Sequence, residues 1–221
     1  MNALIFDTET TGFQPPVEVI ELAWISWPNT DELEFCSYYK PSKPIEFGAM
    51  ATHHITADML EEAEPATLAA GHLPQANYLI GHNVDFDWEA MGRPPGSRIC
   101  TLALSRSLWP ECDSHKLTAL YYFLNGTSPS VKATVQGAHR ALDDVLMTRN
   151  ILHHIIKKLN VHDLERLYAA SEDARIPKVM PFGKYKDQPI SAVDRGYANW
   201  YRRQTDTDPY VIEAFRRAGL C

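Results

Sequence analysis

The sequence predicts an α/β domain, in which a five-stranded mixed sheet is flanked by helices, followed by a small α+β module. Segments rich in β-branched and aromatic residues come first, and helical patterns alternate with short strands after them. The last helical pattern of the domain ends at Ile176-Pro177, and we place the boundary between the domain (1–174) and the module (175–221) there. At 221 residues the chain can form one well-buried domain and an appendage.

Five segments carry the residues that favour strands, and the first three should form a meander. Turn-forming residues at 12–16 join the first two into a hairpin, so the second strand should run antiparallel to the first. The segments are Ala3–Asp7, Val17–Trp27, Leu33–Lys40, Asn77–Gly81 and Arg98–Thr101.

The longest predicted helix runs from His139 to Leu159, because apolar residues recur there at intervals of three and four. Around this helix, Asp144 lies on the flank of the apolar stripe and can reach the sheet, whereas Asp143 points nearly opposite and is expected to face water. Shorter helical patterns begin after Thr56, at Pro65 and near Asp85, and cover 101–109, 115–124 and 162–173.

The formal net charge of −7 by itself disfavours a nucleic-acid partner, because phosphate contacts need Lys and Arg. The charge is unevenly distributed, however. Residues 175–221 hold nine Lys/Arg and five Asp/Glu, which leaves 12 basic and 23 acidic residues for 1–174. The acidic excess therefore lies in the domain, where a metal site would need carboxylates, and the basic excess lies in the tail.

The sequence contains no pattern that predicts export or membrane insertion. The N-terminus has a short apolar run without a basic leader, and no stretch is long and apolar enough to span a bilayer. The four cysteines show no CxxC pairing, which indicates neither a zinc site nor a disulfide framework. We therefore expect a soluble, cytoplasmic protein that does not bind membranes.

Three acidic elements are candidates for chemistry. Asp7 and Glu9 lie two residues apart at a strand end, so both side chains point to one face of the sheet. Asp87 lies at the start of a helix, and His139 and Asp144 lie on the long helix. Each element also has a structural interpretation, namely a polar strand exit, acidic residues that stabilise a helix N-terminus, and an exposed helix end. Together, the three can converge on one edge of one sheet.

In order, spacing and flanking residues, these elements resemble the motifs of the DnaQ-like exonucleases of the DEDD superfamily, histidine subtype. The matching stretches are DTETTG at 7–12, HNVDFD at 82–87 and HRALDD at 139–144, with ATHHIT at 51–56 as a weaker shared segment. The resemblance implies a ribonuclease H-like fold and 3′→5′ exonuclease activity. Asp85 and Asp143 match no motif position and are left out of the site.

Carried over position by position, the resemblance implies a set of metal-binding carboxylates and a general base, His139. Phosphodiester hydrolysis needs a nucleophilic water and neutralisation of the phosphate, which two divalent ions about 4 Å apart provide, and hard oxygen ligands favour Mg²⁺ or Mn²⁺ over zinc. In the resemblance Asp7 bridges the ions, Glu9 and Asp144 lie nearer the nucleophile, and Asp87 holds the second ion. His139 would take the proton of the attacking water.

The residues after the first motif are predicted to bind the substrate. Thr10, Thr11 and Gly12 can offer backbone groups to the terminal nucleotide. Phe13 occupies the position where family members place an apolar wedge against the last bases, and stacking on a ring tolerates any base. A core or turn aromatic is the alternative interpretation of Phe13.

The tail resembles the C-terminal segment of exodeoxyribonuclease X-type members of this family, through PFGKYKDQPISAV at 181–193 and GYANWYRR at 196–203. Asp187 stands where a Gly is common. Basic and aromatic residues alternate in this tail, a mixture that suits phosphates and stacked bases. The alternative is a packing module in which Tyr185, Trp200 and Tyr201 form a core and the charges form a solvated face.

The resemblance favours single-stranded DNA or frayed DNA 3′ ends as the substrate, with small RNA as an alternative within the same chemistry. Two alternatives of another class are a catalytically silent nucleic-acid-binding module and a polymerase accessory subunit. A silent module has no chemical need for all five site residues, which this chain has. A homodimer or a polymerase partner is compatible with these functions.

Overall fold

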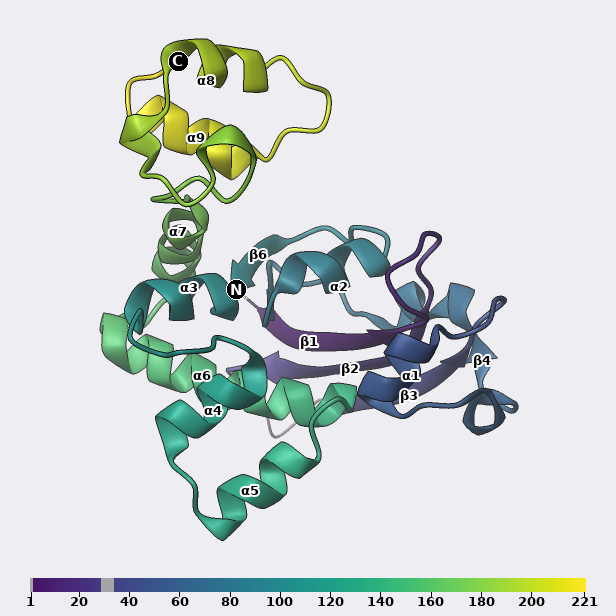
Figure 1. Cartoon of the computed structure of the whole chain (residues 1–221). Helices are drawn as coiled ribbons and strands as arrows, with labels where there is room; N and C mark the ends of the chain where they lie inside the picture. The colour runs from purple at the N-terminus through teal and green to yellow at the C-terminus, as the bar shows by residue number, and fades with distance from the viewer. Residues whose placement is uncertain (1, 29–33) are drawn as a thin grey trace. The chain divides into compact units, whose positions relative to one another are not determined.

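The computed structural model describes residues 2–28 and 34–221 and divides the chain into two compact units, Met1–Ala169 and Ala170–Cys221 (Figure 1). The division lies within helix α7 (Leu164–Arg175), whereas the sequence places the domain boundary at the end of this helix. No helix in the described part of the chain is long and apolar enough to cross a membrane.

The first unit is built on a mixed sheet in which five strands correspond to the five expected segments. β1 (Ala3–Thr10) pairs antiparallel with β2 (Val19–Trp27), and β2 pairs antiparallel with β3 (Glu34–Lys40). On the other side of β1, β5 (Tyr78–Gly81) and β6 (Ser97–Cys100) continue the sheet in parallel. The predicted α/β class with an antiparallel second strand is thereby confirmed.

Two elements between β3 and β5 are absent from the sequence prediction. A two-residue strand, β4 (Glu64–Pro65), pairs with the end of β3, so the sheet has six strands in the order β4-β3-β2-β1-β5-β6 rather than five. Helix α1 (Phe47–His53) follows the Pro-containing segment after β3. The helical patterns after Thr56 and Pro65 form 3₁₀ turns, η1 (Ala57–Leu60) and η2 (Ala66–His72). Leu33, at the start of the third predicted strand, lies outside the described residues.

Helices cover both faces of the sheet. Figure 1 shows α2 (Val84–Ala90) and α6 (Ala141–Leu159) on opposite sides of β1, and both helices contact that strand. α3 (Thr101–Leu108) and α4 (Leu117–Asn125) pack against α6, and α5 (Pro129–Gln136) packs against α4.

The alternation of side chains along β1 places its carboxylates. Phe6 packs in a buried cluster with Val84 of α2, while Ile5, which is fully buried, points to the opposite face of the sheet. Burial of a side chain such as Ile5 stabilises the fold by about 1.5–3 kcal/mol, so the strand is firmly held. Asp7 and Glu9 continue the Ile5 face beyond the apolar residues. The two carboxylates therefore project from the end of a rigid strand on the α6 side.

The second unit is small and mostly helical. It contains η3 (Gly183–Tyr185), η4 (Ile190–Ala192), α8 (Arg195–Tyr201) and α9 (Pro209–Arg217). Among the described residues of this unit, the β component of the expected α+β module amounts to one bridge between Val179 and Pro189. The unit has its own buried core, made of Met180, Ile190, Val193, Ala198, Tyr201, Val211, Ala214 and Phe215.

The turn at Asp187 keeps the geometry that a glycine would adopt. Asp187 has a φ of 63°, in the left-handed region that Gly enters freely and Asp tolerates better than most residues. Its backbone N–H donates to the carbonyl of Met180 at 2.8 Å. The departure from the common Gly at this position is therefore accommodated.

Candidate active site

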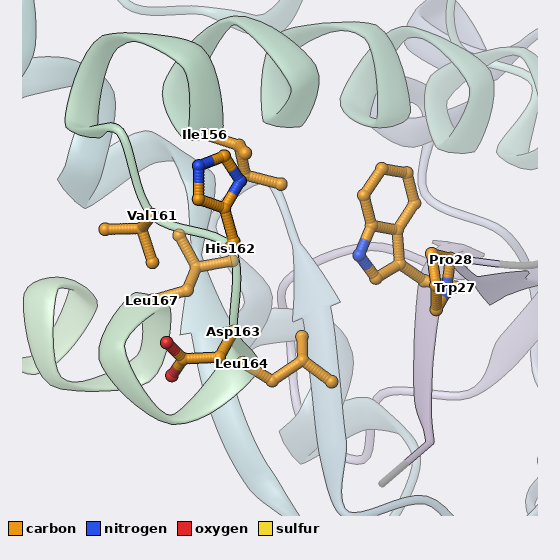
Figure 2. A pocket seen from close by; sticks show the side chains of 8 residues that line it. All are labelled: Trp27, Pro28, Ile156, Val161, His162, Asp163, Leu164 and Leu167. Carbon is orange, nitrogen blue, oxygen red and sulfur yellow. The ribbon is translucent and has the colours of Figure 1, made fainter.

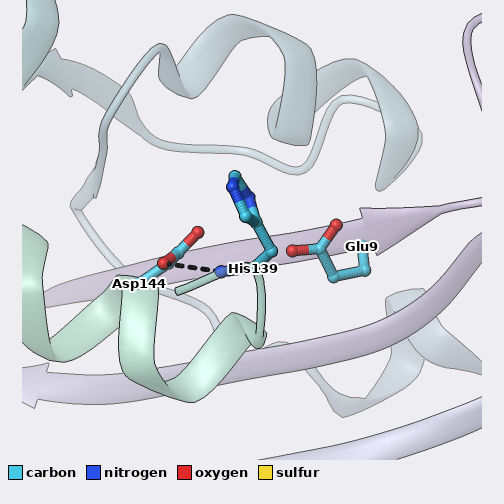
Figure 3. Close-up of side chains that lie close together, drawn as sticks. All are labelled: Glu9, His139 and Asp144. Atoms are coloured by element: carbon cyan, nitrogen blue, oxygen red, sulfur yellow. Dashed lines mark hydrogen bonds between the residues drawn. The ribbon is translucent and has the colours of Figure 1, made fainter. Parts of the chain in front are cut away.

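The end of β1 and the start of α6 bring together three of the predicted site residues. Figure 3 shows Glu9 projecting from the strand, Asp144 from the first turn of the helix, and the His139 imidazole between them. One potential ligand atom from each of the three lies within 4.8 Å of the other two. The geometry is that of a compact cluster of oxygen and nitrogen donors.

Asp87 reaches the same strand from the opposite helix. Its carboxylate is buried and its Oδ1 accepts two hydrogen bonds from Thr8, at 3.0 Å from the backbone N–H and 2.7 Å from the hydroxyl. Thr8 points to the α2 face of β1, whereas Asp7 and Glu9 point to the α6 face. Carboxylates therefore approach the end of β1 from both sides of the sheet.

The pKa values of the acidic groups are raised, chiefly by burial. Burial raises the pKa of Glu9 to about 9, followed by the charges of Asp144 and Glu21. Burial likewise raises the pKa of Asp87 and of Asp144 to about 7 each. The pKa of Asp7 is raised by burial first and then by the charge of Asp87. A bound cation would reverse these shifts, because it favours the ionised carboxylates.

His139 lies just before α6 in a left-handed backbone conformation, with a φ of 66°. Its backbone N–H donates to Oδ1 of Asp144 at 3.2 Å, which ties the residue to the cluster while the imidazole stays exposed. Partial burial lowers the pKa of His139, and the nearby His54 and Lys116 lower it further. The ring is therefore neutral near pH 7 and can accept a proton.

Glu21 is a buried carboxylate that the sequence analysis missed. It lies opposite Glu9 in the β1–β2 register and has a relative exposure of 1%. Its Oε1 accepts from the Arg140 guanidinium at 3.3 Å, and its Oε2 accepts from the Ala141 backbone N–H at 3.1 Å. These bonds anchor the chain directly after His139. The one available signal was a charged residue inside the otherwise apolar segment VIELAWISW.

The loop after β1 is held by Glu46, another residue that the sequence analysis did not single out. The Glu46 carboxylate accepts from the backbone N–H groups of Phe13, at 3.3 Å, and Gln14, at 3.0 Å. A Cβ on Gly12, whose φ is 138°, would overlap that carboxylate. Glycine at position 12 therefore allows the loop to close on Glu46.

Thr10 and Thr11 are both buried, and Thr11 braces this loop. The Thr11 backbone N–H donates to the Glu18 carbonyl at 2.9 Å, and its carbonyl accepts from the Glu46 N–H at 2.8 Å. Both backbone groups of Thr11 are thus used within the protein, which argues against the expectation that they bind a nucleotide. The Thr10 hydroxyl donates to the Gly12 carbonyl at 3.3 Å.

An open cleft of about 900 Å³ adjoins the acidic cluster and includes His139 and Asp144 in its lining. Phe13 also lines it, with 78% of its surface exposed and its ring 5.4 Å from that of Phe86. His82 also lines the cleft and is held in place by its ring nitrogens, which bond the Thr101 hydroxyl at 3.0 Å and the His115 carbonyl at 2.8 Å. The remaining lining residues are Asn83, Leu102, Arg106, Ser114, His115, Lys116, Leu117 and Thr118.

A second pocket of about 390 Å³ lies at the far end of β2. Figure 2 shows Trp27 and Pro28 on one side and His162, Leu164 and Leu167 on the other. Apart from His162 and Asp163, its lining side chains are apolar. With Asp163 as the one carboxylate among its described lining residues, this pocket offers no acidic cluster like the one at the end of β1.

The two aspartates that were left out of the site have other surroundings. Asp85 forms an ion pair with Arg98, whose guanidinium lies 4.1 Å from the centroid of the Trp88 ring. The helical pattern predicted that Asp143 faces water, but in the structure this residue is half-buried. Its carboxylate lies beside Gly137, where a Cβ would come within 2.7 Å of Oδ2.

Known proteins similar to this chain include several nucleases. The chain is 29% identical over 212 residues to Exodeoxyribonuclease 10 of Escherichia coli K12, a match that covers 92% of this chain and 91% of the relative. It is 26% identical over 192 residues to a DNA polymerase III subunit epsilon-like protein of Rhodobacter capsulatus, covering 79% of this chain and 26% of that protein. The structure of Exonuclease X in complex with 5′ overhanging duplex DNA has a TM-score of 0.65 and 28% identity, over 76% of this chain and 99% of that one.

Residues 4–152 match the family model RNase_T, described as Exonuclease. The matched region is more than half of the chain, and it contains Asp7, Glu9, Asp87, His139 and Asp144. On this match, the chain belongs to the RNase_T exonuclease family and is a DnaQ-like 3′→5′ exonuclease acting on nucleic acid.

Proposed function

We propose that this exonuclease removes nucleotides one at a time from single-stranded or frayed 3′ ends of DNA and releases nucleoside 5′-monophosphates. The observation that carries the proposal is the convergence of Glu9, His139 and Asp144 within 4.8 Å at the edge of an open cleft. The proposed catalytic residues are Asp7, Glu9, Asp87, His139 and Asp144.

The donor set fits divalent cations, which family membership implies, and we propose two Mg²⁺ or Mn²⁺ ions. Asp7, Glu9, Asp87 and Asp144 would hold them through carboxylate oxygens, which these hard cations prefer. The raised pKa values support this assignment, because burial first and then mutual repulsion disfavour the ionised carboxylates until positive charge is supplied. When bound, the cations supply the charge that neutralises the phosphate and the leaving oxygen.

His139 would accept the proton of the attacking water. Its lowered pKa keeps the imidazole neutral near pH 7, and its exposure leaves the ring open to the cleft. The bond from its backbone N–H to Asp144 and the anchoring of Arg140 by Glu21 hold the residue in place. These contacts limit the positions that the base can take.

Of the predicted substrate-binding segment Thr10, Thr11, Gly12 and Phe13, Phe13 is the proposed contact, and the internal bonds of Thr11 give the preceding residues the role of holding the loop. The exposed Phe13 ring can stack on a terminal base, which gives affinity without sequence preference. DNA is proposed rather than RNA because the chain is similar over most of its length to a protein named as an exodeoxyribonuclease. It is also similar to a nuclease whose structure contains DNA.

The proposal is tested with a 5′-labelled single-stranded DNA oligonucleotide and its RNA counterpart, in Mg²⁺, Mn²⁺ or chelator. We expect stepwise shortening of the DNA from its 3′ end that requires a metal ion and is lost in Asp7→Ala. Faster shortening of the RNA would replace the proposed substrate by the small-RNA alternative. Degradation that is unaffected by chelator or by Asp7→Ala would contradict the assigned site.

A further inference from the structure

Three aromatic side chains of the second unit form a continuous surface feature. The rings of Tyr185 and Tyr197 have centroids 5.1 Å apart, and those of Tyr197 and Trp200 are 5.3 Å apart. Trp200 is 54% exposed, and the two tyrosines are half-buried. We call these three residues the aromatic strip.

Within the strip, Tyr185 and Tyr197 are partly buried and pack against the core of the unit, whereas Trp200 lies outside that core. Tyr201, the neighbour of Trp200, is buried in that core and packs against Phe215. Trp200 is absent from the buried cluster, and its large exposed surface contributes little to the stability of the unit. The alternative of a core formed by Tyr185, Trp200 and Tyr201 therefore holds for Tyr201, holds in part for Tyr185, which packs against the core, and is wrong for Trp200.

The local structure holds the strip in place. Asp194 caps α8 by accepting from the Tyr197 backbone N–H at 2.8 Å, and it also accepts the hydroxyl hydrogen of Tyr185. Gly183 lies directly under the Tyr197 hydroxyl, where a Cβ would clash. One aspartate and one glycine thus fix the two tyrosines relative to the helix that carries Trp200.

Exposed basic side chains flank the strip, and two of them have no anionic partner among the described residues. Lys184 Nζ lies 5.0 Å from the Tyr185 ring centroid, and 4.0 Å from an exposed Asp194 carboxylate. Lys186 and Arg203 are exposed and form no ion pair with any residue that the structure describes. By contrast, Arg216 on α9 is paired with Glu213. Lys186 and Arg203 therefore remain available to an external anion.

We propose that the aromatic strip, with Lys184, Lys186 and Arg203, is a second nucleic-acid-binding surface that takes a single-stranded segment. Exposed rings offer a platform for bases, and exposed Lys and Arg side chains offer contacts to phosphates. These two features together match a single strand better than a duplex, whose bases are already stacked. The inference goes beyond the exonuclease site and does not depend on its metal ions.

The test measures binding of the full chain to a fluorescent oligodeoxythymidine by anisotropy, in chelator so that no hydrolysis occurs. Trp200→Ala is expected to weaken binding on the order of tenfold, because a stacked base is lost, whereas Trp200→Phe should largely retain it. The double variant Lys186→Gln/Arg203→Gln should flatten the slope of log affinity against log salt by roughly 1.4, about 0.7 for each phosphate contact to a single strand.

Two exposed residues outside the strip serve as controls. Phe123→Ala removes a 44% exposed ring from α4, and Arg216→Gln removes a cation that is already paired. Both should bind like the wild type, and Trp200→Ala should hydrolyse a trinucleotide in Mg²⁺ at the wild-type rate. Wild-type affinity in Trp200→Ala, or an unchanged salt slope in the double variant, would overturn the proposal and favour a protein partner for the strip.

Discussion

Asp143 and Asp144 are adjacent carboxylates on one helix with different surroundings, and they form a matched pair for mutagenesis. Asp144 is buried within the acidic cluster, whereas the carboxylate of Asp143 lies beside Gly137. Asp144→Asn should lower kcat by about 100-fold or more, because it removes a proposed metal ligand and keeps the side-chain volume. Asp143→Asn should stay within a few-fold of the wild type. Oligonucleotide shortening and calorimetric Mg²⁺ titration measure both variants, and equal losses would argue against Asp144 as a ligand.

Phe13 is the residue whose exposure bears most directly on substrate binding. Because the ring is 78% exposed beside the cleft, Phe13→Ala should leave the fold intact. We expect KM for single-stranded DNA to rise by roughly 5- to 100-fold, the range for loss of one base–aromatic stack of about 1–3 kcal/mol. Steady-state kinetics with Phe13→Tyr as the conservative control measure this effect. An unchanged KM would indicate that Phe13 does not contact the substrate and is only a structural residue of the turn.

At the scale of elements, the contact between β2 and α6 positions the proposed general base. Glu21→Gln removes the charge that holds Arg140 and weakens the acceptor for the Ala141 N–H. We expect kcat to fall about tenfold or more, since the segment after His139 loses its anchor and small misplacements are costly. The pH–rate profile should change as well, because the surroundings of His139 change.

The matched control for Glu21 is Glu18, which lies just before β2 and binds Ser42 rather than α6. Its carboxylate accepts from the Ser42 N–H at 2.6 Å and from the hydroxyl at 2.5 Å. Glu18→Gln should therefore alter stability more than kcat. If the two variants lost kcat to the same extent, with the same pH profile, a specific role of Glu21 in positioning His139 would be excluded.

For the whole molecule, the raised pKa values link stability to pH and to metal. The pKa of Asp87 is raised from 3.8 to about 7 and that of Glu9 from 4.5 to about 9. A raised folded-state pKa means that the folded protein binds these protons more tightly than the unfolded chain. The contribution of these bound protons to the free energy of unfolding is complete below about pH 4. It is lost as the pH rises through about 7, where Asp87 ionises, and then 9, where Glu9 ionises.

We therefore expect the Tm of the chelator-treated protein to fall between about pH 5 and 9 as these protons are lost. Mg²⁺ should raise Tm more at about pH 8 than at about pH 5, because cations bind the ionised carboxylates. Thermal melts monitored by fluorescence, with and without Mg²⁺, measure both effects. In Asp7→Asn the Mg²⁺ effect should shrink. A Mg²⁺ effect equal at both pH values would contradict the proposed ligands.

The sequence by itself determined the order of elements and the residues with catalytic potential. The period-two pattern of a strand predicts which face of the sheet a side chain occupies, so Asp7 and Glu9 could be assigned to one face. The period-3.6 pattern of a helix likewise predicted that Asp144 lies on the side of its helix that faces the sheet. Resemblance of three motifs then identified the family, which the comparison confirmed. These properties are local, and each can be inferred from a few neighbouring residues.

Only the tertiary structure decided how distant segments support one another. The buried Glu21 anchors Arg140 because of the strand register that sets it opposite Glu9 and beside the start of α6. The bonds from Thr8 to Asp87, and the use of both Thr11 backbone groups within its own loop, likewise depend on long-range packing. No periodicity encodes such contacts, because their partners lie far apart in the chain and meet only when the sheet and helices assemble.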